Sequence, residues 1–183
     1  RAKVLDVGCG TGWVSWYFAW RYKDMKLDVE GVDCSPVMLD RARVVVPGGR
    51  FTRGDVCALT HDDDAFDVVT TVYTLRNFPN LERGLREMYR VCAPGGVVII
   101  LDAFPAKNFA MRCVLYAWLE LVMPLVAMLF TRDAKAYRYL SASIRSTVAV
   151  GRVGEMLEAL GAEVEVREYT FGTAARIVAR KPS

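Results

Sequence analysis

Apolar positions along this chain of 183 residues follow two periods, one typical of strands and one typical of helices. Strands are predicted at Lys3–Val7, Leu27–Asp33, Arg50–Arg53, Phe66–Val72, Val97–Asp102, Ala162–Phe171 and Ala174–Arg180. Helices are predicted at Gly12–Tyr22, from about Val37 to Val45, at Leu81–Val91 and at Val153–Leu160. This alternation predicts a doubly wound α/β fold in one domain, residues 1–183, that ends in an antiparallel hairpin.

Turn residues support several of these boundaries. Ser35 followed by Pro36 is typical of a helix N-cap with proline in the first turn. Pro94-Gly95-Gly96 is expected to close the helix that precedes it, and Gly161 is expected to stop the last helix. Between the fifth and sixth strands, at about residues 105–150, lies a long apolar segment that we expect to form a helical insertion.

Three glycines follow the first predicted strand at intervals of two: Gly8, Gly10 and Gly12. Glycines at a strand-to-helix turn let the backbone approach a ligand closely. A dinucleotide fingerprint needs a glycine where Trp13 stands, and the carboxylate of Asp6 would repel phosphates. The ammonium and sulfonium groups of S-adenosylmethionine (SAM) suit Asp6 better, so the turn favours SAM over an ordinary glycine turn or a dinucleotide site.

Two further carboxylates follow predicted strands at the edge where such sheets bind ligands. Asp33 ends the second strand and could accept hydrogen bonds from both ribose hydroxyls, and Asp55 follows the third strand and could accept from the adenine amine. The Val56 amide could then serve a ring nitrogen of adenine. The predicted SAM-binding residues are Asp6, Gly8, Gly10, Thr11, Gly12, Asp33, Cys34, Asp55, Val56 and Val72.

Composition bears on three further questions: a nucleic-acid partner, the state of the cysteines and a metal site. The net charge of +3, from 24 basic and 21 acidic residues, predicts no nucleic-acid partner. Five cysteines without a CxxC pair are typical of the reduced thiols of a cytoplasmic protein. His61 is the single histidine, so we expect no metal site, and its acidic run His61-Asp62-Asp63-Asp64 is interpreted as a solvated loop.

Three segments give the chain a specific resemblance: Leu75-Arg76-Asn77-Phe78, Glu87-Met88-Tyr89-Arg90-Val91 before Pro94-Gly95-Gly96, and Tyr137-Arg138-Tyr139-Leu140-Ser141-Ala142-Ser143-Ile144. With the glycine turn, they make it similar to the UbiE/MenG/Coq5 family of class I SAM-dependent methyltransferases. That family C-methylates prenylated quinols in menaquinone and ubiquinone biosynthesis. The resemblance implies a Rossmann-like, doubly wound sheet of seven strands with a helical insertion on the substrate side.

The chain also departs from the family pattern. Tyr73-Thr74 stands where the family usually has Phe-Gly, and Leu101-Asp102-Ala103-Phe104 replaces Leu-Glu-Phe-Ser. Ser146-Thr147 replaces a Phe-Pro pair. The family places a helical lid segment before the glycine turn, and we expect that segment to be absent here. These departures concern the substrate side more than the cofactor.

The resemblance implies site roles for four residues. Arg76 is expected to stabilise a phenolate and Asn77 to orient a hydroxyl; alternatively, Arg76 pairs with a carboxylate and Asn77 caps a turn. Tyr137 and Tyr139 are expected to contact the quinol head group, or else to pack between helices.

The apolar stretch Phe109–Phe130 is too short and too interrupted for a membrane-spanning helix, because Glu120 would lie near the centre of the span. It is either a buried helix, a wall for a prenyl tail, or a surface that rests on the membrane or on a second subunit of a homodimer.

The predicted activity is therefore SAM-dependent methylation of a prenylated quinol, with demethylmenaquinol as the expected substrate. The alternatives are a benzoquinol of the ubiquinone pathway, another small-molecule methyl acceptor, and a SAM-binding protein without catalysis. The expected location is the cytoplasm, with peripheral contact to the membrane.

Overall fold

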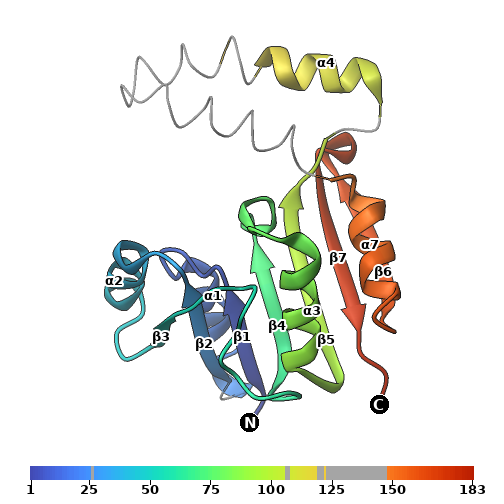
Figure 1. Ribbon diagram of the computed structural model, residues 1–183. Coiled ribbons are helices and arrows are strands. Elements are labelled where there is room, and N and C mark those ends of the chain that lie inside the picture. The colour runs from blue at the N-terminus through green and yellow to red at the C-terminus, as the bar shows by residue number, and fades with distance from the viewer. Residues whose placement is uncertain (26, 106–107, 119–121, 123–147) are drawn as a thin grey trace.

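The centre of the computed structural model, which describes residues 1–25, 27–105, 108–118, 122 and 148–183, is a seven-stranded sheet (Figure 1). The strands are β1 (Lys3–Val7), β2 (Asp28–Asp33), β3 (Arg50–Arg53), β4 (Phe66–Val72), β5 (Cys92–Ala103), β6 (Glu163–Tyr169) and β7 (Ala174–Arg180). Their order is β3-β2-β1-β4-β5-β7-β6, and β7 runs antiparallel to both of its neighbours. The doubly wound fold predicted from the sequence is therefore confirmed, including its terminal hairpin.

Helices cover both faces of this sheet. The helices among the described residues are α1 (Trp13–Arg21), α2 (Pro36–Val45), α3 (Leu81–Val91), α4 (Phe109–Ala117) and α7 (Val150–Glu158), with short 3₁₀ turns at Lys23–Met25, Leu75–Asn77 and Thr170–Gly172. The chain crosses the sheet in opposite directions from β1 and from β4, so right-handed crossovers place α1 and α2 on one face and α3 on the other. α7 packs beside α3 over β6 and β7, and α4 lies beyond the carboxyl end of β5 (Figure 1).

Local chemistry explains where the helices begin. The Ser35 hydroxyl accepts a hydrogen bond from the Met38 N–H at 3.4 Å, and Pro36 occupies the first turn of α2, as predicted. At α3 the Asn80 side chain accepts from the Arg83 N–H at 2.9 Å. Each bond satisfies an amide that has no partner inside its helix.

β5 is longer than the sequence indicates. The predicted strand Val97–Asp102 begins instead at Cys92 and passes through the Pro-Gly-Gly segment that was expected to act only as a helix stop. The Gly95 N–H donates to the Lys181 carbonyl at 2.9 Å, and the Lys181 N–H donates to the Gly96 carbonyl at 3.0 Å. Hydrogen bonds to the chain after β7 thus continue the sheet pairing through Gly95 and Gly96, where the glycines alone would be expected to end the strand.

The main core lies between the sheet and α3 and α7. Leu85, Met88 and Val91 of α3 are fully buried, as are Val98 and Ile100 of β5. Their spacing on α3 at intervals of three is that of one helix face. This core holds the carboxyl ends of β4 and β5 in fixed positions, and those ends carry the residues of the site described below.

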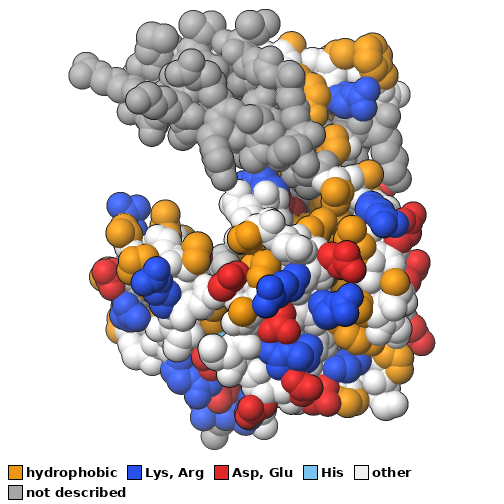
Figure 2. All heavy atoms as spheres, viewed as in Figure 1, with side chains coloured by type: hydrophobic (Ala, Val, Ile, Leu, Met, Phe, Trp, Pro, Cys, Tyr) orange, Lys and Arg blue, Asp and Glu red, His pale blue; other side chains and the backbone are white. Residues whose placement is uncertain are grey.

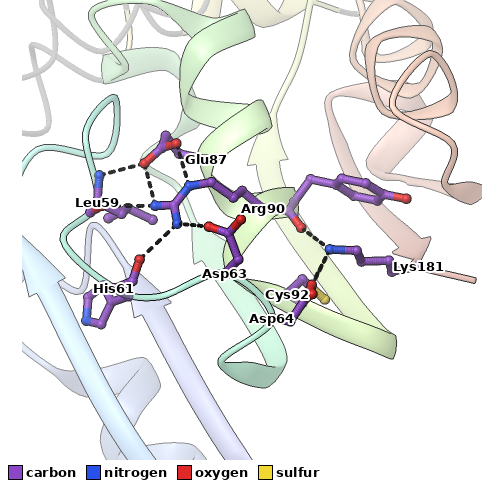
Figure 3. Close-up of polar contacts among 9 residues, drawn as sticks. Leu59, His61, Asp63, Asp64, Glu87, Arg90, Cys92 and Lys181 are labelled. Carbon is purple, nitrogen blue, oxygen red and sulfur yellow. Dashed lines mark hydrogen bonds and ion pairs between the residues drawn. The ribbon is translucent and has the colours of Figure 1, made fainter. Parts of the chain in front are cut away.

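Residues 54–65, between β3 and β4, contain neither helix nor strand, and a polar cluster attaches them to α3 (Figure 3). Arg90 donates to the carbonyls of Leu59 and His61 at 2.9 Å and pairs with Asp63 at 2.6 Å. It also pairs with Glu87, whose carboxylate accepts the Leu59 N–H, and these contacts lower the pKa of Glu87 below its ordinary value.

The acidic run that the sequence indicated as a solvated loop is thus a set of anchors. Asp64 pairs with Lys181 at 2.6 Å, and the same ammonium donates to the carbonyls of Tyr89 and Cys92 (Figure 3). The His61 ring contacts Glu30 at 3.0 Å. A run of acidic residues predicts a loop. Whether those side chains are solvated or form ion pairs depends on residues that are distant in the sequence.

Candidate active site

A cavity of about 490 Å³ lies at the carboxyl ends of β1, β2 and β3 and beside the turn that follows β4. The strand order reverses between β1 and β4, which is where doubly wound sheets bind ligands. The described residues that line the cavity are Val7, Gly8, Gly10, Val32, Asp33, Cys34, Met38, Gly54, Asp55, Val56, Thr74, Asn77, Phe78 and Pro79. Its volume is in the range of small-molecule sites.

The glycine turn forms one wall. The N–H groups of Gly8 and Cys9 donate to the Val32 carbonyl at 2.7 and 3.0 Å, which fastens the turn to the end of β2. Gly10 has φ of +53°, and a Cβ built on it would meet no heavy atom within 4 Å. The backbone at Gly10 is therefore open toward the cavity, and a ligand could approach it as closely as a hydrogen atom permits.

Thr74 holds this turn from the side of β4. Its hydroxyl donates to the Gly8 carbonyl at 3.1 Å, and a Cβ on Gly8 would lie 2.3 Å from the Thr74 methyl carbon. Gly8 is thus required by close packing, whereas Gly10 faces open space. Thr74 was singled out in the sequence only as a departure from the family pattern, and its contact with a residue 66 positions away carries no local signal.

Asp33 is fixed by two backbone amides. Its Oδ2 accepts from the Gly10 N–H at 2.9 Å and its Oδ1 accepts from the Ser35 N–H at 2.8 Å. Each carboxylate oxygen has a second lone pair, so both can accept further hydrogen bonds. Asp33 lines the cavity, so its carboxylate could accept hydrogen bonds from the two hydroxyls of a ribose diol there.

Asp6 lies behind the glycine turn, outside the set of described residues that line the cavity. It is 1% exposed, and its Oδ2 accepts a hydrogen bond from the Ser15 hydroxyl at 2.7 Å. Burial raises the pKa of Asp6 to about 6, although the bonds from Ser15 oppose the shift. Ser15, the buried residue of α1, was not found from the sequence, since a single serine in an apolar helix gives no signal.

The remaining predicted SAM-binding residues divide between the cavity and its supports. Cys34, Asp55 and Val56 line the cavity, and the Asp55 carboxylate accepts the Cys57 N–H at 2.8 Å, which shapes the loop after β3. Thr11 and Gly12 lie in the turn beyond Gly10, and Val72 ends β4. Gly12 lets α1 approach α2, because a Cβ there would lie 3.0 Å from the Ala42 Cβ.

Arg76 and Asn77, predicted as catalytic, form the 3₁₀ turn that follows β4. Asn77 lines the cavity. Arg76 pairs with Asp102 at the end of β5, with 2.5 Å between Nη1 and Oδ1, which is the carboxylate pairing that the alternative interpretation predicted. Its guanidinium carbon also lies 6.0 Å from the centre of the Tyr73 ring.

Tyr137 and Tyr139, the predicted substrate contacts, lie outside the described residues. Of the apolar insertion, the structure describes α4 and a few flanking residues. Phe109, Val114 and Trp118 are 70%, 63% and 52% exposed, and Figure 2 shows apolar side chains gathered over α4. On the face that carries α3, the same view shows positive and negative side chains interspersed. Among the described residues, no helix is long and apolar enough to cross a bilayer.

The fold and this site together define a class I SAM-dependent methyltransferase. The open backbone at Gly10, the carboxylate of Asp33 at the cavity wall and the volume of the cavity are all compatible with SAM. Solved structures agree on the fold. A SAM-dependent methyltransferase from Aquifex aeolicus superposes with a TM-score of 0.66 at 17% identity, covering 98% of this chain and 81% of that one. A TehB-like SAM-dependent methyltransferase from Corynebacterium glutamicum gives 0.64 at 18%, covering 100% and 80%.

Sequence comparison is more specific. The model of the ubiE/COQ5 methyltransferase family matches residues 1–181. The demethylmenaquinone methyltransferase of Deinococcus radiodurans is 35% identical over 98% of this chain and 75% of its own length. The enzyme of the same name from Thermus thermophilus is 34% identical over 98% of this chain and 83% of its own length. That of Bacillus subtilis is 33% identical over 95% of this chain and 77% of its own length. The chain belongs to the ubiE/COQ5 methyltransferase family, and SAM is its methyl donor.

Proposed function

We propose that this enzyme C-methylates a prenylated quinol and that its substrate is demethylmenaquinol. The observation that carries the proposal is the match to relatives named demethylmenaquinone methyltransferase over nearly the whole chain, at 31–35% identity. Asn77, which lines the cofactor cavity next to Arg76 in the same 3₁₀ turn, supports it, since a quinol oxygen needs a polar partner near the transferred methyl group.

The reaction forms one carbon–carbon bond. SAM supplies an electrophilic methyl group, and the electron pair of the broken carbon–sulfur bond stays on sulfur. A ring carbon of the quinol becomes nucleophilic when its neighbouring phenol is deprotonated or shares its proton. The ring carbon then loses its own proton to an aspartate or to water, which restores aromaticity. Holding the two reactants in line contributes much of the rate enhancement in such a transfer.

We assign this chain's residues the following roles. The guanidinium of Arg76 stabilises the developing phenolate by charge. Asn77 donates to or accepts from a quinol hydroxyl and so orients the ring. Asp33 holds the ribose, Gly10 admits the methionine part of SAM, and Asp55 with Val56 forms the adenine end of the cavity.

Methyl transfer from labelled SAM tests the proposal. Demethylmenaquinol and the corresponding ubiquinol precursor are offered separately, and the products are separated by chromatography. We expect labelled menaquinol from the first substrate at a rate at least tenfold above that of the second. Absence of product from demethylmenaquinol, with SAM binding verified by calorimetry, would refute the proposal.

We also propose that residues 1–183 act as one domain whose segment at about 105–150 forms the substrate side and touches the membrane, either as a monomer or as a homodimer. The exposed apolar side chains of α4 support this, because a prenyl tail must be shielded from water. Val114→Glu should weaken co-sedimentation with anionic vesicles, whereas Val44→Glu, at a 79% exposed position on α2, should not. Equal binding of both variants to the vesicles would refute a role of α4 in membrane contact.

A further inference from the structure

The ion pair between Arg76 and Asp102 is the most deeply buried charge pair that the described residues form. Asp102 has no exposed surface, and the Arg76 side chain is 12% exposed. The Asp102 Oδ1 accepts both the Arg76 Nη1 at 2.5 Å and the Ala103 N–H at 2.7 Å. The other carboxylate oxygen, Oδ2, and the Arg76 Nε have no hydrogen-bond partner among the described residues.

Such a pair is a weak source of stability. Removing two charges from water costs several kcal/mol each, and an apolar pair of similar volume often stabilises a fold as well or better. The free energy of folding therefore does not explain why this edge of the sheet carries a buried carboxylate. The pair does restrict the guanidinium to one orientation, because Oδ1 is bound to the rigid backbone of β5 through the Ala103 N–H.

A second observation places the pair at a functional position. Tyr73, the residue after β4, has φ of +56°, a left-handed conformation that is strained for a non-glycine residue. Its N–H donates to the Leu101 carbonyl at 2.8 Å, which holds the strained residue against β5. The half-exposed ring lies next to the Arg76 guanidinium. Strained residues of this kind concentrate at sites where geometry must be precise.

The guanidinium is thus flanked by Asp102 from β5 and by the ring of Tyr73, the residue after β4, and the next residue, Asn77, lines the cofactor cavity. We propose that Asp102 is a positioning residue, which fixes the Arg76 guanidinium one residue from the cavity wall so that its charge acts on the quinol oxygen. The inference rests on the proposed function, in which Arg76 stabilises the phenolate.

The test compares Asp102→Asn, Arg76→Ala and the double variant for kcat, for the KM of the quinol and for SAM affinity. Asp102→Asn keeps the shape of the side chain and removes its charge. We expect kcat to fall at least tenfold while the dissociation constant for SAM changes less than twofold, and we expect Asp102→Glu to recover part of the rate. Asp28→Asn, which removes a carboxylate paired with Arg50 at the protein surface, is the matched control and should keep its rate.

The double variant shows whether Asp102 positions Arg76 or has only a structural role. If Asp102 acts through Arg76, the double variant should be no slower than Arg76→Ala. Added guanidinium ion should raise the rate of Arg76→Ala several-fold, because Asp102 can hold it, and should not raise the rate of the double variant. The double variant leaves neither charge of the pair without its partner, and in Arg76→Ala the added guanidinium ion takes the place of the missing partner of Asp102. The rescue comparison therefore decides the question even if Asp102→Asn folds poorly.

Three results would contradict the inference: a kcat for Asp102→Asn within twofold of the parent, losses that multiply in the double variant, or equal guanidinium rescue with and without Asp102. Failure of the proposed function gives a different pattern. In that case Arg76→Ala itself keeps the parental rate, or the parent makes no product from demethylmenaquinol.

Discussion

Gly10 is the position where a single methyl group should separate cofactor binding from folding. Its φ of +53° makes Gly10→Ala strained by about 1–2 kcal/mol, while the added Cβ meets no protein atom within 4 Å. For a domain of this size, 1 kcal/mol lowers the unfolding temperature by roughly 2–4 °C. The variant should therefore fold, but its methyl group projects into the space that a ligand must enter. We expect SAM affinity to fall at least tenfold, which is about 1.4 kcal/mol.

Two other glycines give this prediction its controls. Gly48 has φ of +78° and equally open surroundings but lies in the turn after α2, so Gly48→Ala should lose similar stability and keep its SAM affinity. Gly8→Ala adds a clash of 2.3 Å with Thr74 to the backbone strain and should cost about 2–5 kcal/mol of unfolding free energy. Calorimetry with SAM and urea denaturation measure the two quantities. If Gly10→Ala binds SAM as tightly as Gly48→Ala does, the assignment of the glycine turn is refuted.

Three further predictions follow from the contacts around the cavity. Because burial raises the pKa of Asp6 from 3.8 to about 6, the folded state holds its proton more tightly than the unfolded state does. From this group the free energy of unfolding should therefore decrease by roughly 2 kcal/mol between pH 4 and pH 6. Urea titrations of Asp6→Asn should lack that component, and parallel curves for both proteins would contradict it. Asp33→Asn should weaken SAM binding about 10–100-fold in calorimetry, since hydrogen bonds to a charged group are lost, and unchanged affinity would remove Asp33 from the site. Arg90→Met should lower the unfolding free energy by about 2–3 kcal/mol. Arg86→Met, which breaks an exposed pair with Glu82, should change it by less than about 1 kcal/mol. Similar losses in the two variants would show that the contacts of Arg90 contribute no more to stability than an exposed ion pair.

Elements with a strong local pattern were predicted from the sequence to within a few residues. β1, β3, β4, α3 and β7 have the predicted bounds, because their apolar residues repeat with a clear period and end at charged or turn residues. The glycine turn and the carboxylates after β2 and β3 were also placed at one edge, since parallel strands end together. Six of the ten predicted SAM-binding residues line the cavity.

The features that the sequence did not predict depend on contacts between distant residues. The extension of β5 requires the chain after β7, and the clamp of Thr74 on Gly8 joins two separate turns. Whether Arg76 faces a substrate or a carboxylate depends on Asp102, 26 residues further on. Local propensity carries no information on such partners.

The loop of residues 54–65 connects the cavity to a polar cluster on α3 that does not line the cavity. Its first residues line the cavity, while its later residues are attached to α3 by Arg90 and to the chain after β7 by Lys181 (Figure 3). Without a helix or strand of its own, this loop is held in place by those side-chain contacts and by the buried Leu59. Arg90 does not line the cavity, yet it helps to fix the loop that carries Asp55 and Val56 there. We therefore expect substitutions at Arg90 to alter cofactor binding and to leave Arg76 and Asn77 in place.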